Sequence, residues 1–243
     1  MIKYLSILYL LIATSAIGQE SVESIITKMD DNRTFTNSKM VGNLTITDQY
    51  GTRHSEFIAY TRGDYDSLIE FTSKAEYGQK ILRTEDALYL YFPDSEEIIT
   101  LRGSALKQSL LGSDISYEDL TADRGTLYSY DARLLGQEVV DSYMCHKIEL
   151  IAKNKSVAYF KQVVWIDINR YVTLKGEYFS KSGRLIKKMN ILEVIQKGGH
   201  FIPIKSELVD QLKRNTKTIM SVDTIDINSE LDNEIFTLEH LSW

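Results

Sequence analysis

An alternation of apolar and polar residues with a period of two runs through most of this chain and restricts its fold more than any other feature. From Met40 to Ile227 the chain is a series of short segments, such as MVGNLTITD, SLIEF and ALYLYF, separated by turn sequences such as Lys181-Ser-Gly-Arg and Lys197-Gly-Gly-His. Successive side chains of a strand point to opposite faces, and short turns join antiparallel neighbours. We therefore expect roughly a dozen antiparallel strands, in a mainly β protein with a few helices.

Two segments have a helical period instead. Apolar residues at i, i+3, i+4 and i+7 predict one amphipathic helix near the N-terminus, with Val22, Ile25, Ile26 and Met29 on its apolar face. The second segment, GSALKQSLLGSD, interrupts the strands. Ser104 can cap a helix there and Gly112 suits its C-terminal end. We expect a short apolar helix over residues 104–111, with one face formed by Leu106, Leu110 and Leu111.

A sheet of this many strands must curl or split, and a curled sheet needs something inside it. In ALYLYF, Leu88, Leu90 and Phe92 share one face and two tyrosines share the other, so neither face is polar. Ile69 and Phe71 share a face in the same way, as do Val163 and Trp165. This pattern fits a sheet with core on one side and a helix or partner on the other. A packed sandwich without a cavity predicts the same alternation, and both interpretations stay open.

Length and charge limit the domain count and the partners. The chain has 243 residues, its two prolines lie inside the strand region, and no Pro-rich or Ser-rich linker divides it, so we expect one domain over residues 19–243. The formal net charge is −6 and no basic block is present. Nucleic acids and anionic lipid headgroups reward clustered Lys and Arg, so neither is expected as the main partner.

The first 18 residues predict a secretory signal peptide. Lys3 precedes an apolar run that ends in small residues, and cleavage before Gln19 fits this pattern. The apolar run is shorter than the ~20 residues of a membrane span, which disfavours the alternative of an uncleaved anchor. Cys145 is the single cysteine, so the chain cannot form an internal disulfide.

The sequence shows no recognisable catalytic or metal-binding pattern. Four scattered histidines form no HExxH motif, and GxSxG, P-loop and GxGxxG motifs are absent. Cys145 and His146 are adjacent and point to opposite faces of a strand, so they cannot form a nucleophile–base pair. The acidic residues of SDISYED have no identifiable catalytic partner. We therefore expect a protein that is not an enzyme and uses no cofactor or metal.

The stretch SLLGSDISYEDL carries a specific resemblance. Together with LLGQEVVDSYMCHKIELIAK and the ending IDINSELDNEIFTLEHL, it resembles the bacterial outer-membrane lipoprotein-sorting proteins, distant relatives of the LolA and LolB carriers. The likeness extends over residues 71–241. The family motif is close to S-F-M-G-S-D-F-S-Y-E-D-L, and its polar part is matched by Gly112, Ser113, Asp114, Ser116, Tyr117, Glu118, Asp119 and Leu120.

The resemblance implies a half-open, strongly curved antiparallel β-barrel whose concave apolar face is covered by helices. Residues 104–111 would form a lid, and the polar motif a hinge that returns the chain to the barrel; a rigid corner needs the same local bonds and stays an alternative. The expected ligand-binding residues are Ile69, Phe71, Leu88, Leu90, Phe92, Trp165, Leu106, Leu110 and Leu111. The expected hinge residues are Gly112, Ser113, Asp114, Tyr117, Glu118 and Asp119.

The function implied is that of a periplasmic carrier that shields lipid or lipoprotein acyl chains during outer-membrane lipoprotein sorting or lipid transport. Such a carrier would act as a monomer and touch membranes only transiently. The alternative is an accessory interaction module of an envelope export system of the RND type, which carries no ligand and binds an inner-membrane transporter. Lipid that co-purifies with the protein favours the carrier, and a dry, filled interior favours the module.

Overall fold

The computed structural model describes residues 20–242 apart from residues 64, 86, 121–124 and 155–156. The signal peptide expected over residues 1–18 lies outside this described part. Thirteen strands are present: β1 Asn37–Asp48, β2 Gly51–Arg62, β3 Asp66–Phe71, β4 Lys80–Arg83, β5 Leu88–Phe92, β6 Glu97–Leu101, β7 Tyr130–Val140, β8 Tyr143–Ala152, β9 Lys161–Asp167, β10 Thr173–Phe179, β11 Leu185–Lys197, β12 His200–Asp210 and β13 Lys217–Ile227. The helices are α1 Val22–Asp31, α2 Tyr117–Leu120, α3 Thr126–Ser129 and α4 Leu238–Leu241, with short 3-10 turns η1 Gly103–Lys107, η2 Leu110–Gly112 and η3 Asn233–Phe236.

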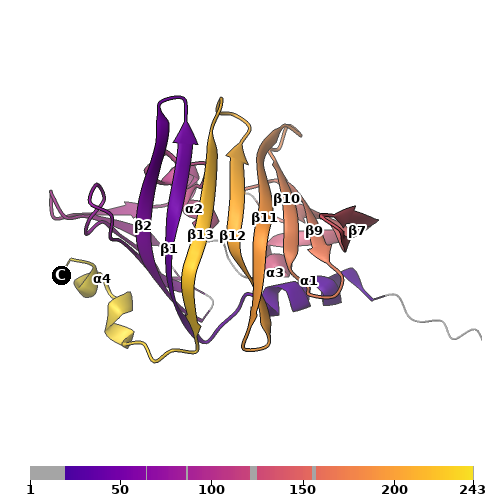
Figure 1. Cartoon of the computed structure of the whole chain (residues 1–243), viewed down its shortest axis with the longest axis horizontal. Coiled ribbons are helices and arrows are strands. Elements are labelled where there is room, and N and C mark those ends of the chain that lie inside the picture. The colour runs from indigo at the N-terminus through magenta and orange to yellow at the C-terminus, as the bar shows by residue number, and fades with distance from the viewer. Residues whose placement is uncertain (1–19, 64, 86, 121–124, 155–156, 243) are drawn as a thin grey trace, which may run out of the picture.

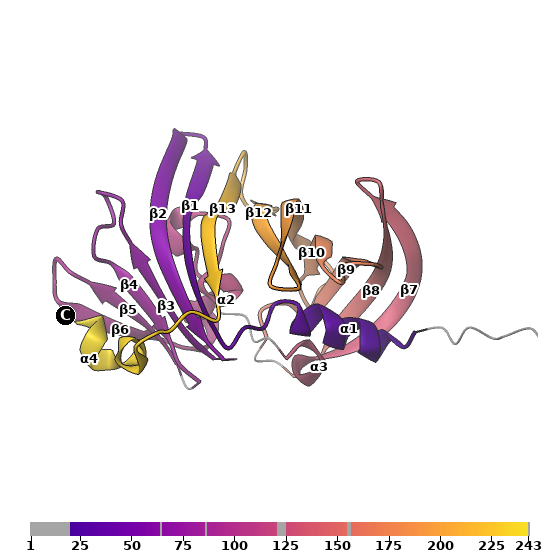
Figure 2. The same cartoon turned by 60° about the horizontal axis from the view of Figure 1, so that its bottom comes forward.

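All thirteen strands form one antiparallel sheet, in the order β6-β5-β4-β3-β2-β1-β13-β12-β11-β10-β9-β8-β7. Strands that follow one another in the chain pair with each other, except β6 and β7, and β13 also pairs with β1. The sheet bends into a curved wall (Figure 2), but its edge strands β6 and β7 do not pair with each other, so it stays open. The expected mainly β, curved antiparallel architecture is confirmed.

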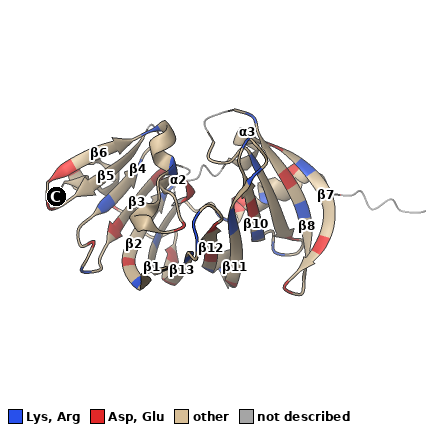
Figure 3. Ribbon diagram, turned by 90° about the horizontal axis from the view of Figure 1, so that it is seen from above, with Lys and Arg blue, Asp and Glu red and all other residues tan. Residues whose placement is uncertain are grey.

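One face of this sheet can be followed from β7 to β2, because residues directly opposite in neighbouring strands share a face. A row of such pairs runs through Leu134, Ile148, Val164, Gly176, Met189, Leu208, Thr218, Ile46 and Arg53. We call the face that carries this row the inner face. Seen from above (Figure 3), the sheet is U-shaped, and α2 and α3 lie on the open side of the U.

Two segments cover the inner face. Helix α1 lies over β7–β9, where Ile25, Ile26 and Met29 pack against Ile148 and Val164. Ser21 caps this helix by accepting a hydrogen bond from the Ser24 N–H (3.1 Å). The other half of the inner face, on β1–β5 and β12, is covered by residues 103–112, which comprise η1 and η2 and which we call the lid segment. The predicted N-terminal amphipathic helix is confirmed.

The lid segment differs from the short helix predicted over residues 104–111. It consists of two 3-10 turns separated by Gln108 and Ser109, whose backbones are both extended (φ −66° and ψ 147° at Gln108, φ −66° and ψ 130° at Ser109). Leu111 has a left-handed backbone (φ +49°), and so has Gly112 (φ +70°). Leucine spacing alone does not show this break, because the break depends on where the two turns are anchored.

The outer face of the sheet is covered on one half. The chain after β13 runs past β1 and β2 and ends in η3 and α4 (Figure 1), and it lines a groove together with side chains of β1–β4. Phe236 and Leu241 pack there against Leu68 and Leu82. The strands of this half therefore carry apolar side chains on both faces, as the two-sided pattern of the sequence predicts.

Candidate functional site

The inner face under the lid segment brings together most of the residues predicted to bind ligand. Ile69, Phe71, Leu88 and Leu90 are buried there from β3 and β5. Four further residues predicted to bind ligand belong to this cluster or pack against it: Phe92, Leu106, Leu110 and Leu111. Leu110 is 1% exposed and is the most deeply buried side chain of the lid segment. The sequence thus identified one continuous apolar surface and the segment that covers it.

A small void lies beside the lid segment, against β3–β5. It is lined by Phe71, Ile81, Leu90, Leu110 and Tyr117, among others, and has a volume of about 10 Å³. A single water needs at least about that much. At this place Leu110 therefore leaves little room between the lid segment and the sheet.

Trp165 does not belong to this cluster. It lies on the outer face of β9, in a separate cluster with Cys145, Val163 and Leu174. The ammonium groups of Lys147 and Lys175, on the two neighbouring strands, lie 4.9 and 4.1 Å from its ring centre. The structure separates Trp165 from the other predicted ligand-binding residues because the sheet lies between them.

Two basic side chains, each in or near a hairpin, attach the lid segment to the sheet through hydrogen bonds. Arg53 on β2 donates a hydrogen bond to the Leu111 carbonyl oxygen (2.9 Å). Lys213, between β12 and β13, donates to Ser109 Oγ (2.8 Å) and to the Gly112 carbonyl oxygen (3.2 Å), and also to the Ser113 carbonyl oxygen. Sequence reasoning identified neither residue, since each reaches the lid segment from a distant turn.

The first half of the predicted hinge is a buried anchor. Asp114 is 2% exposed. Its carboxylate accepts hydrogen bonds from Thr216 Oγ1 (2.5 Å), Thr218 Oγ1 (2.9 Å) and the Asp210 N–H (3.0 Å). Ser113 is fully buried and its hydroxyl accepts from the Ile115 N–H (3.1 Å). These bonds attach the lid segment to β12 and β13.

The same polar motif closes a small loop on itself. The Leu110 N–H donates to the Ile115 carbonyl (2.8 Å), and the Tyr117 N–H donates to the Gln108 carbonyl (3.2 Å). Leu110 and Ile115 both lie in the inner-face cluster. Gly112, Ser113 and Asp114 therefore lie inside a compact loop, between the lid segment and α2.

The second half of the motif forms a buried ion pair. Asp119 on α2 pairs with Lys187 on β11 and accepts a hydrogen bond from the Tyr159 hydroxyl (2.6 Å). The Ser116 N–H and hydroxyl also donate to Asp119, each at 2.8 Å. Sequence reasoning missed Lys187. Its signal is a lysine at the inner-face position two residues before Met189, where the alternation calls for an apolar residue.

Glu118 is next to Asp119 in the chain, and its pKa is raised. Its carboxylate oxygen Oε2 is buried and has no hydrogen-bond partner among the described residues. Burial, together with the Asp119 charge, raises its pKa to about 7, although Lys107, Arg83 and Lys187 oppose the shift. Because the folded pKa lies above the unfolded value, the proton binds more tightly to the folded protein.

We expect Glu118 to make the protein less stable as pH rises from about 4.5 to about 7. Below that window the protonated carboxyl is tolerated in both states, and above it the folded protein carries a poorly solvated charge. Glu118→Gln should therefore raise the unfolding free energy by about 2 kcal/mol at pH 8 and change it little at pH 4. Urea unfolding at the two pH values measures this difference. Glu193→Gln, at an exposed position on β11, is the control, and an unchanged pH dependence in Glu118→Gln would contradict the prediction.

Cys145 is buried, and burial with the nearby Asp167 charge raises the pKa of its thiol to about 11, so the reactive thiolate is disfavoured. Within the described part of the chain, no three His, Cys, Asp or Glu side chains are grouped so that they could hold a metal ion. No helix of the described residues is long and apolar enough to cross a membrane.

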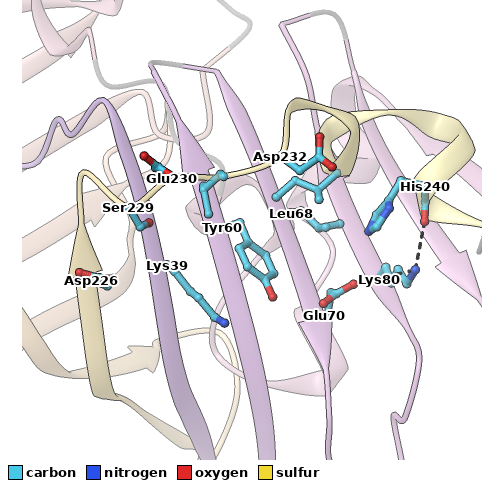
Figure 4. Close-up of a pocket in the computed structure, with 12 residues that line it drawn as sticks. Lys39, Tyr60, Leu68, Glu70, Lys80, Asp226, Ser229, Glu230, Asp232 and His240 are labelled. Carbon is cyan, nitrogen blue, oxygen red and sulfur yellow. Dashed lines mark hydrogen bonds and ion pairs between the residues drawn. The ribbon is translucent and has the colours of Figure 1, made fainter.

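A larger groove lies on the outer face, between β1–β4 and the chain after β13 (Figure 4). Its volume is about 620 Å³, and its walls are mostly charged or polar. Lys80 donates a hydrogen bond across it to the His240 carbonyl oxygen (3.1 Å). Glu70 lies 3.9 Å from the Lys80 ammonium. This polar groove differs in character from the apolar surface under the lid segment.

A family model described as "Uncharacterized protein" matches residues 63–243 of the chain. No curated protein matches this chain. Among solved structures, a DUF1329 family protein from Desulfovibrio piger is 24% identical, with a TM-score of 0.84 and coverage of 89% of this chain and 96% of that one. An outer-membrane lipoprotein-sorting protein domain from Vibrio parahaemolyticus is 18% identical, with a TM-score of 0.82 and coverage of 90% and 97%.

A LolA superfamily protein from Nitrosomonas europaea is 24% identical, with a TM-score of 0.76, and the match covers 91% of this chain and all of that one. At these identities the likeness concerns the fold. The LolA-like fold expected from the sequence is confirmed by these structures.

Proposed function

Since the chain belongs to the family whose model matches residues 63–243 and shares the fold of LolA superfamily proteins, we propose that it is a periplasmic carrier of lipid or lipoprotein acyl chains. Residues 1–18 direct its export, and residues 19–243 act as one non-enzymatic unit. The observation that carries the proposal is the continuous apolar cluster on the β1–β5 half of the inner face, which is covered by a lid segment rather than by a further sheet.

In this proposal the lid segment occupies the place of the acyl chains. When a chain enters, Leu106, Leu110 and Leu111 leave the inner face. Burying about ten methylenes contributes roughly 8 kcal/mol, and exposing the buried Leu110 and the partly buried Leu106 and Leu111 costs at most roughly 5–9 kcal/mol. The exchange is therefore close to balance before association costs are counted. A carrier needs this balance, because it must both load and release its ligand.

The lid contacts supply a direct test with a matched control. Lys213→Met removes the ammonium that holds Ser109, Gly112 and Ser113, so the closed state loses stability and a fluorescent acyl probe should bind about 5- to 10-fold more tightly. Lys217→Met makes the same change at an exposed position on β13, next to Glu207 and away from the lid segment. It should leave probe affinity unchanged.

The result that contradicts the carrier is equally concrete. If neither the parent nor Lys213→Met binds the probe, and mass spectrometry of the gently purified protein detects no co-purified lipid, the proposal fails. A change of equal size in Lys217→Met would show that net charge, and not the lid contact, controls binding.

One observation favours a second candidate function. The void beside Leu110 is only about 10 Å³, so this part of the inner face is already filled without a ligand. An accessory interaction module for an RND-type export system has no need of a cavity. That alternative predicts stoichiometric binding to an inner-membrane protein, with no acyl-probe binding.

A further inference from the structure

The inner face holds a buried cation on β11 whose ion-pair partner comes from α2. Lys187 is 6% exposed, and Asp119 is the acid within ion-pair distance of it among the described residues. Across the sheet, Lys187 is opposite Asp210 of β12 on one side and Tyr178 of β10 on the other. Asp210 is engaged elsewhere, since its carboxylate accepts the Leu212 N–H (2.8 Å). The charge of Lys187 is therefore balanced by α2 and not by the sheet.

The donors around Asp119 divide into two groups. Lys187 and Tyr159 belong to the sheet side: Lys187 lies on β11, and Tyr159 lies in the connection from β8 to β9, two residues before β9 begins. The rings of Tyr159 and Tyr178 lie 4.6 Å apart between centres, and the Lys187 ammonium is 5.5 Å from the Tyr159 ring. Ser116, the third donor, belongs to the same short segment as Asp119. If α2 moves, Asp119 and Ser116 leave together, and an ammonium and a hydroxyl remain on the sheet.

Without Asp119, the Lys187 ammonium and the Tyr159 hydroxyl favour an anionic ligand. An ammonium left in a poorly solvated place without a counter-charge is strongly disfavoured. A carboxylate or phosphate oxygen restores the charge-assisted hydrogen bonds that Asp119 made. Met189, two residues along the same face of β11, packs against the apolar cluster under the lid segment. An anionic group at Lys187 can therefore belong to a molecule whose acyl chain lies in that cluster.

We propose that Lys187 and the Tyr159 hydroxyl form a receptor for the anionic group of an amphiphilic ligand, and that Asp119 occupies this receptor when the protein is empty. The inference rests on the proposed carrier function and adds the ligand class, an acyl chain that ends in a carboxylate or a phosphate. Asp119 then acts as an internal competitor of the ligand.

Probes of equal chain length separate headgroup recognition from chain binding. Decanoate, monodecyl phosphate and 1-decanol are titrated against the full chain by calorimetry. In the parent protein the two anions should bind about 10-fold more tightly than decanol, which corresponds to one charge-assisted hydrogen bond. Asp119→Asn should increase that preference at least a further 5-fold, because the internal competitor loses its charge. The ratio of decanoate to decyl phosphate affinity then shows which anion fits better.

The double variant Asp119→Asn/Lys187→Gln keeps a hydrogen-bonding pair without any buried charge, and it serves where Lys187→Gln alone fails to fold. It should bind all three probes with the same affinity within about 2-fold. Lys188→Gln makes the same change one residue away, on the opposite face of β11, and should keep the anion preference. If decanol binds as tightly as the anions to the parent and to Asp119→Asn, the anion receptor is wrong and the carrier stands. If no protein binds any probe, the carrier proposal itself fails and this inference falls with it.

Discussion

Asp114→Ala should lower the unfolding free energy by about 3–4 kcal/mol, a larger loss than any other single change to the polar motif. The Asp114 carboxylate is the buried acceptor for the hydroxyls of Thr216 and Thr218 and for the Asp210 N–H. Alanine leaves these donors in the protein interior without an acceptor, and each unsatisfied buried donor costs about 1–3 kcal/mol. Urea unfolding monitored by tryptophan fluorescence measures the loss.

Two further variants make this result specific. Asp114→Asn keeps one acceptor oxygen and should lose less than half as much stability. Asp131→Ala removes a carboxylate that is 77% exposed and 3.7 Å from Lys153, and it should change stability by less than about 0.5 kcal/mol. Equal losses in Asp114→Ala and Asp131→Ala would show that Asp114 is not an anchor of the fold.

Leu110→Glu should open the lid segment and expose the inner face. Leu110 is 1% exposed and is surrounded by the apolar cluster of β1–β5. Burying an unpaired carboxylate there costs several kcal/mol, so above the pKa of the new group the closed state is strongly disfavoured. We expect an apolar dye to bind this variant at least about 10-fold more tightly than the parent at pH 8. The effect should fade at acidic pH, where the protonated side chain can be buried.

Leu110→Gln is the matched control, because it has nearly the same shape and carries no charge. It should show a smaller gain in dye binding that does not depend on pH. The competing interpretation, a permanently packed interior, predicts another pair of results: global destabilisation by several kcal/mol in thermal unfolding, and no dye binding by either variant. That outcome would remove the carrier and leave the interaction module as the better proposal.

The apolar part of the candidate site could be read from the sequence because its signal is local. Within β5, the period of two already places Leu88 and Leu90 on one face. The lid leucines were recognised from their spacing and from the motif that follows them. The same reasoning could not place Trp165. Whether a residue of β9 shares a face with residues of β5 depends on the register of every strand between them, and on irregularities such as those at Val41/Gly42 and Thr173/Lys175.

The polar part of the site depended on contacts between distant segments. Asp119 and Lys187 are 68 residues apart in the chain, and Asp114 lies 104 residues from Thr218. The motif GSDISYEDL indicated a polar corner, but its partners lie on β11–β13 and in the turn at Lys213. Nothing in the local pattern of those strands identifies them as partners of this corner.

The sequence by itself determined the strand-rich architecture, the amphipathic α1, and the apolar character of both the inner face and its covering segment. These properties follow from residue periodicity, caps and turns, which act between near neighbours in the chain. The tertiary structure alone decided that residues 103–112 form two 3-10 turns, that Leu110 leaves a void of only about 10 Å³ against β3–β5, and that Trp165 lies on the outer face. It also placed a buried lysine opposite Asp119. These features arise when thirteen strands settle into one register, because only then do side chains far apart in sequence compete for the same buried space and the same hydrogen bonds.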